Sequence, residues 1–160
     1  MKPNLKWSPP LIINENFEDS RIAAEMHFKE TVDMYGPQYL VNLIDKKGSQ
    51  QRIGSQFTKL HTELRDKRLQ YVWFDFHGEC KNMKWENLSR LVDICRDELQ
   101  NYGYFMANLT VGFNERERFN NPRSFTILQV QKGTFRSNCM DCLDRTNVVQ
   151  GVFCRFVAHN

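Results

Sequence analysis

A cysteine and an arginine separated by five residues carry the clearest chemical signal in this sequence. Cys139 and Arg145 lie in the stretch 136–147, and Thr146 follows the arginine directly. Five residues are enough to turn once around a tetrahedral oxyanion with backbone N–H groups facing it. The cysteine would attack as a thiolate, the guanidinium would bind two oxygens, and the Thr146 hydroxyl would donate to the sulfur. The spacing therefore predicts nucleophilic attack on a phosphate ester.

This chemistry needs a helix directly after the loop, because a helix N-terminus and a nearby guanidinium both favour a thiolate over a thiol. Residues 147–158 have apolar side chains at helical spacing, which predicts that helix. An apolar run at 124–131 reads as a strand, and Lys132-Gly133 reads as a hairpin turn before residues 134–136 lead into the loop. Strand, loop and helix therefore follow one another in the required order.

Three stretches of the sequence resemble one known family, in that family's order. Residues 136–150, RSNCMDCLDRTNVVQ, resemble the signature of the Sac-domain (suppressor of actin) phosphoinositide phosphatases. Residues 74–85, which begin Phe-Asp-Phe-His, and residues 3–10, which begin Pro-Asn-Leu-Lys-Trp, resemble the same family. Among its branches the sequence is more similar to the membrane-anchored type of the endoplasmic reticulum and Golgi than to the synaptojanin type.

The resemblance implies an enzyme that hydrolyses phosphatidylinositol monophosphates at the 4-phosphate, the 3-phosphate or both. It implies a phospho-cysteine intermediate on Cys139, phosphoryl binding by Arg145, and no metal or other cofactor. The partner would be a phosphoinositide lipid at a membrane surface, on the cytoplasmic face of the endoplasmic reticulum or Golgi. The implied substrate-binding loop consists of Met140, Asp141, Cys142, Leu143, Asp144, Arg145 and Thr146.

Two aspartates inside the loop are candidates for the general acid that protonates the leaving inositol oxygen. By similarity to myotubularin-type lipid phosphatases, Asp144 is the first candidate and Asp141 the second, with Asp75 a distant third. The alternative interpretation is that the loop aspartates brace the loop by accepting backbone N–H bonds. Asp75 and His77 lie at or near the carboxyl end of the predicted strand 69–76, where they either support the loop or handle protons, or instead satisfy backbone groups at the strand end.

The rest of the pattern predicts an α/β fold with a central mixed sheet flanked by helices. Helices are expected at 18–35, at 50–67 and at 82–102, the last capped by Asn82. Strands are expected at 39–44, 69–76, 104–107 and 124–131, with a polar irregular loop at 108–122. By the resemblance, residues 1–160 are a partial catalytic domain that lacks an amino-terminal subdomain, a C-terminal remainder and a membrane anchor.

Composition narrows the remaining classes of function. The net charge of +3 is slight and gives no indication of nucleic-acid binding, although residues 115–160 hold seven Arg and Lys against four Asp and Glu. Five cysteines at irregular spacing favour a reducing compartment. No apolar run is long enough to span a membrane.

Two alternatives from other classes stay open. A catalytically silent phosphoinositide-binding or scaffold module would bind lipid without turnover. Cys139 and Cys142 also form a C-x-x-C pair, which would suit a redox or zinc module. A metal site at His77 and Cys80 is disfavoured, because no second pair of ligands stands at a suitable distance.

Overall fold

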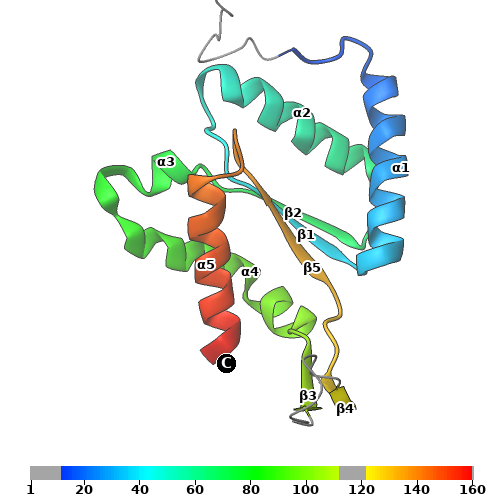
Figure 1. Cartoon of the computed structure of the whole chain (residues 1–160). Helices are drawn as coiled ribbons and strands as arrows, with labels where there is room; N and C mark the ends of the chain where they lie inside the picture. The colour runs from blue at the N-terminus through cyan, green and yellow to red at the C-terminus, as the bar shows by residue number, and fades with distance from the viewer. Residues whose placement is uncertain (1–11, 112–121, 160) are drawn as a thin grey trace, which may run out of the picture.

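The computed structural model of the chain describes residues 12–111 and 122–159 (Figure 1). Its helices are α1 (Phe17–Tyr35), α2 (Gly48–Leu64), α3 (Phe76–Glu79), α4 (Leu88–Tyr102) and α5 (Asp144–His159), with 3₁₀ turns η1 (Lys81–Met83) and η2 (Trp85–Asn87). Its strands are β1 (Gln38–Asn42), β2 (Leu69–Trp73), β3 (Met106–Val111), β4 (Pro122–Gln129) and β5 (Thr134–Asn138). The α/β class predicted from the sequence is confirmed.

A parallel sheet of three strands, in the order β2-β1-β5, forms the centre of the fold. Gln38 of β1 pairs with Leu69 on one side and with Thr134 on the other. All five residues of β1 are buried, because this strand has a neighbour on each side and helices over both faces. The carboxyl ends of the three strands meet at one edge, where ligands gather in open α/β sheets.

Helices cover the two faces of this sheet as pairs, with α1 and α2 on one face and α4 and α5 on the other (Figure 1). The alternation of side chains along β1 explains the division. Tyr39, Val41 and Leu43 pack with α4 and α5, whereas Leu40 packs with α1. The predicted flanking of the sheet by helices is therefore confirmed.

The predicted central sheet is present but is not mixed, since both of its strand pairings are parallel. The antiparallel pair β3 and β4 forms a sheet of its own, and β5 joins β1 in parallel (Figure 1). Lys132-Gly133 is consequently not a hairpin turn, because the chain leaves β4 and crosses to the central sheet. Phe135 explains why β5 pairs with β1, since its ring stacks on that of Tyr39 in the core at a centroid distance of 5.3 Å.

Several predicted boundaries shift for local reasons. The strand expected at 69–76 ends at Trp73, because Asp75 caps α3. Asn82 does not cap the long helix, since it adopts a left-handed φ of 58° inside η1 and α4 begins only at Leu88. The strand expected at 104–107 runs from Met106 to Val111, so the predicted irregular loop begins later than residue 108.

Residues 112–121 of that loop, and the opening stretch 3–10, lie outside the described residues. Within the described ranges, none of the helices combines the length and apolar character that crossing a bilayer requires.

Candidate functional site

The loop predicted from the sequence joins β5 to α5 at the carboxyl edge of the central sheet. The N–H of Leu43, just after β1, donates to the carbonyl of Asn138 across 2.8 Å and fixes the end of β5. Residues 139–143 then turn into α5, which begins at Asp144. Cys139 is only 7% exposed and belongs to the core beneath α4 and α5. A strand, a turn and a helix thus follow one another here, although the strand is β5 and not the one expected at 124–131.

The sulfur of Cys139 has two hydrogen-bond partners in its own loop and helix. The Thr146 hydroxyl donates to Sγ across 3.4 Å, which is the contact expected from the sequence. The thiol in turn donates to Oδ1 of Asp141 across 3.4 Å. Thr146 lies in the first turn of α5, so the sulfur is next to the positive end of that helix.

Asp141 braces the loop. Its Oδ1 accepts the N–H of Leu143 across 3.1 Å in addition to the Cys139 thiol. The Leu143 N–H, then the Cys139 thiol, hold the pKa of the Asp141 carboxyl below its ordinary value of 3.8. A carboxyl held ionised is poorly suited to donate a proton, so these contacts favour the bracing role for Asp141.

Cys142 shapes the turn through its backbone. Its φ of 56° is in the left-handed region, which costs a residue with a β-carbon about 1–2 kcal/mol. Its exposed Sγ lies 3.9 Å from the carbonyl of Cys139, and both cysteines are free thiols. Met140 and Leu143 are also exposed, at 44% and 58%, so the outer part of the loop is open to solvent.

Asp144 is the first residue of α5, and its side chain is exposed. At the start of α5, the backbone N–H of Asn147 donates to the Leu143 carbonyl at 2.8 Å. The N–H groups at the start of a helix have no intrahelical acceptor, which leaves residues 144–146 able to donate to an anion. In the described part of the chain, no hydrogen bond or ion pair engages the Asp144 carboxylate.

Arg145 is anchored at the same edge of the sheet by residues that sequence reasoning missed. Its Nη1 donates to the Leu43 carbonyl at 3.1 Å, and to Oδ1 of Asp45 and Oε1 of Gln50 at 3.3 Å each. No hydrogen bond joins Arg145 to Cys139 among the described residues. Asp45 follows the strand predicted at 39–44, so its place at a carboxyl end was the available signal.

Asp75 and His77 have separate roles, although the sequence offered them as a pair. Oδ1 of Asp75 accepts the N–H of Gly78 across 2.9 Å and so caps α3, which satisfies a backbone group at the strand end. Nδ1 of His77 lies 3.0 Å from Oδ1 of Asp45, the same carboxylate that holds Arg145. The structure therefore connects His77, but not Asp75, to the loop arginine.

A pocket of about 380 Å³ opens beside the start of α5. Asp144 and Arg145 form one wall, and the segment from α3 to η2 forms the other with His77, Lys81, Asn82 and Trp85. Its wall thus combines a guanidinium, an ammonium and an indole ring. Among the residues described, there is no cluster of three or more His, Cys, Asp and Glu side chains that could hold a metal ion.

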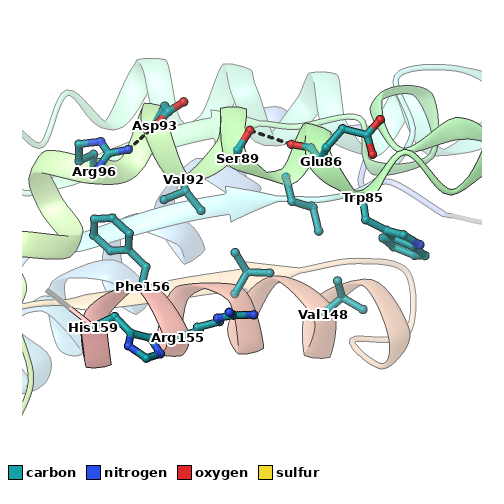
Figure 2. A pocket seen from close by; sticks show the side chains of 12 residues that line it. Trp85, Glu86, Ser89, Val92, Asp93, Arg96, Val148, Arg155, Phe156 and His159 are labelled. Carbon is teal, nitrogen blue, oxygen red and sulfur yellow. Dashed lines mark hydrogen bonds and ion pairs between the residues drawn. The ribbon is translucent and has the colours of Figure 1, made fainter.

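A larger hollow of about 810 Å³ lies farther along α5, between that helix and the segment η2–α4 (Figure 2). Figure 2 shows Val92, Val148 and Phe156 lining it, with the Asp93–Arg96 ion pair at its rim. None of the loop residues 139–145 lines this hollow, so the smaller pocket beside Asp144 is the one that adjoins the candidate site.

The family model of the SacI homology domain matches residues 1–81, just over half of the 160-residue chain. The chain therefore belongs to the SacI homology domain family. The family resemblance predicted from the sequence is confirmed.

Named relatives align over nearly the whole chain. It is 37% identical to the phosphatidylinositol-3-phosphatase SAC1-A of Danio rerio and 36% identical to the phosphatidylinositol-3-phosphatase SAC1 of Saccharomyces cerevisiae, each over 96% of its length. It is 35% identical to the phosphatidylinositide phosphatase SAC2 of Homo sapiens over 82% of its length. The alignment with the Danio rerio protein spans 154 of the 160 residues, so it includes residues 139–145 whichever residue it starts from.

These alignments cover 24%, 23% and 10% of the three relatives. The chain thus spans about a quarter of the length of the two SAC1 proteins.

Proposed function

We propose that the protein carrying this chain is a phosphoinositide phosphatase that uses Cys139 as its nucleophile. One observation carries the proposal: the Thr146 hydroxyl donates to the Cys139 sulfur at the N-terminus of α5. A hydroxyl donor and a helix N-terminus both stabilise a thiolate, which is the nucleophilic form of cysteine. Membership of the SacI homology domain family supports the same chemistry.

The reaction has two displacement steps. The Cys139 thiolate attacks the phosphorus of a phosphate monoester, an S–P bond forms, and the P–O bond to the inositol breaks. Asp144 protonates the leaving oxygen. Water then attacks the phospho-cysteine while the Asp144 carboxylate accepts a proton from that water. The S–P bond breaks, inorganic phosphate leaves, and the thiolate is restored.

Positive charge for both steps comes from the protein itself. Arg145 uses only Nη1 for its three anchoring contacts, so Nε and Nη2 are available for two phosphoryl oxygens. The backbone N–H groups of residues 140–145 complete the binding loop, except that the Leu143 N–H is taken by Asp141. These donors act where charge develops on the equatorial oxygens.

The substrate class is a phosphatidylinositol monophosphate, at the 4-phosphate or the 3-phosphate, presented on the cytoplasmic face of endoplasmic reticulum or Golgi membranes. The SAC1 relatives are named phosphatidylinositol-3-phosphatases, which supports a phosphoinositide substrate. The pocket beside Asp144 supports it as well, since Trp85 offers an aromatic face for the inositol ring and Lys81 a positive charge.

Phosphate release from short-chain phosphatidylinositol 4-phosphate, with a chelator present, tests the proposal in the full-length protein. Cys139→Ser and Arg145→Ala should abolish release, whereas the control Cys154→Ser removes an exposed thiol of α5 and should leave it unchanged. The same assay on the 3-phosphate and on phosphotyrosine ranks the substrates.

A folded protein that binds the lipid without releasing phosphate would instead be a phosphoinositide-binding or scaffold module. Bound metal or a readily titrated dithiol that is unaffected by Arg145→Ala would instead point to a C-x-x-C redox or zinc module at Cys139 and Cys142.

A further inference from the structure

The Asp45 carboxylate lies between two cationic or potentially cationic side chains from distant parts of the chain. Its Oδ1 is 3.3 Å from Nη1 of Arg145, in α5, and 3.0 Å from Nδ1 of His77, in α3. The Asp45 and Arg145 side chains are only 15% and 12% exposed. Their ion pair is therefore shielded from solvent, unlike the exposed pairs that contribute little.

Gln50 closes a ring of contacts around this pair. Its Oε1 accepts the backbone N–H of Asp45 at 3.0 Å and Nη1 of Arg145 at 3.3 Å. The Leu43 carbonyl is a third acceptor for the same Nη1. One nitrogen of the guanidinium thus has three acceptors, all contributed by the segment from the end of β1 to the first turn of α2.

Fixing one nitrogen of a planar guanidinium also fixes the direction of the other two. Arg145 is one of the residues that line the pocket beside Asp144, and its Nε and Nη2 make no hydrogen bond within the described residues. Arginine presents two parallel donors to a phosphate only when its plane is held, and a small misplacement of such a group can lower the rate about 100-fold.

We propose that Asp45 is a positioning residue that holds Arg145 by Nη1 and directs its remaining N–H groups toward a phosphate monoester bound at the loop. This inference rests on the proposed phosphatase function. The opposite arrangement, in which Asp45 withholds Arg145 from the phosphate, makes the opposite prediction for every measurement below.

Turnover in the full-length protein gives the first test. Asp45→Asn should lower kcat/KM for short-chain phosphatidylinositol 4-phosphate by about 10- to 100-fold. The matched control is Asp33→Asn, since Asp33 also pairs with an arginine, Arg68 at 3.7 Å, but is 55% exposed on α1. Unchanged or increased kcat/KM in Asp45→Asn, with the control at wild-type activity, would overturn the proposal.

Ligand binding gives a second test that does not need turnover. In a Cys139→Ser background, Asp45→Asn should weaken binding of the short-chain lipid about tenfold by titration calorimetry. The same change should have almost no further effect when Arg145→Ala is also present, because Asp45 acts through Arg145. A purely structural role would weaken binding equally in both backgrounds and would overturn the proposal.

The two proposals fail in distinguishable ways. If the wild type releases no phosphate but Asp45→Asn still weakens binding through Arg145, the phosphatase proposal fails and the positioning role holds. If the wild type hydrolyses the lipid and Asp45→Asn changes neither kcat/KM nor binding, only the positioning role fails. A folded protein that neither binds nor hydrolyses the lipid overturns both.

Discussion

The side-chain nitrogen of Asn138 donates to the side-chain oxygen of Asn42 across 2.9 Å, directly before the candidate nucleophile. Asn42 is fully buried in β1, and its own nitrogen donates to the Tyr71 hydroxyl at 3.1 Å. The Tyr71 hydroxyl also accepts from Thr58 of α2 at 3.1 Å. A chain of polar groups therefore runs across the three strands of the central sheet, from Asn138 at the end of β5 to Thr58 of α2.

Asn42→Ala should destabilise the protein by about 2–3 kcal/mol, because it leaves the Asn138 amide and the Tyr71 hydroxyl without their partner. Urea denaturation followed by circular dichroism measures this loss. Asn101→Ala, at an exposed position of α4, is the control and should shift the free energy of unfolding by less than about 0.5 kcal/mol. Equal shifts for the two variants would contradict the prediction.

Two helical glycines should respond to alanine in opposite directions. A methyl group at Gly54 of α2 would overlap the indole ring of Trp73. That ring is held in place because its Nε1 donates to the Ile44 carbonyl at 2.8 Å. A methyl group at Gly151 of α5 would meet no atom within 4 Å. Gly54→Ala should therefore cost about 1–3 kcal/mol from overpacking, whereas Gly151→Ala should gain about 0.5–1 kcal/mol from helix propensity.

Thermal unfolding of the two variants, side by side with the wild type, checks this pair. A stabilised Gly54→Ala would mean that Trp73 moves aside readily, and the close approach of α2 to β2 would not depend on glycine.

Asp144→Asn should lower kcat/KM for the lipid far more than kcat/KM for p-nitrophenyl phosphate, because kcat/KM reports formation of the phospho-cysteine and not its hydrolysis, which both substrates share. An inositol alkoxide needs a proton to leave, whereas p-nitrophenolate leaves without one, so only the first reaction loses the general acid, by about 100- to 10,000-fold. Steady-state rates with both substrates measure the ratio. Asp141→Asn is the comparison, and its effect on the two substrates should be similar, because Asp141 braces the loop. If Asp141→Asn shows the substrate-dependent loss, the acid is Asp141 and not Asp144.

Asp141 should also give the loop a specific dependence on acid. Its pKa is lowered in the folded protein, so its ionised form contributes stability that is fully present above the ordinary value of 3.8. That contribution is lost as pH falls through the lower, folded pKa. The wild type should therefore exceed Asp141→Asn in urea midpoint at pH 7, and the difference should shrink below about pH 4. Asp97→Asn, exposed on α4, serves as the control. If the difference in urea midpoint between the wild type and Asp141→Asn persists unchanged in strong acid, the prediction is wrong.

Sequence reasoning found the elements whose patterns are local. The helix after the loop, the contact of Thr146 with Cys139 and the strand ending near Asp75 follow from spacing and composition over a few residues. The separation of β3 and β4 from the central sheet did not follow, because strand pairing is decided by tertiary packing such as that of Phe135 on Tyr39.

Local sequence patterns also could not predict how Arg145 is anchored. Asp45 is 100 residues from its partner, and a lone aspartate in a turn with two lysines reads as solvated. Only the parallel pairing of β1 with β5 brings the turn after β1 next to the start of α5.

That pairing also sets the order in which the fold can assemble. Gln38 meets Leu69 after 31 residues but meets Thr134 only after 96, so closing the second connection costs about 1 kcal/mol more in chain entropy. The β1–α2–β2 unit can form early during synthesis, whereas β5 joins it only after the ribosome has released residue 138. The environment of Cys139 is consequently the last part of the central sheet to mature. A mutation in β1 can therefore delay folding of the loop that holds Cys139, although it changes no residue near the sulfur.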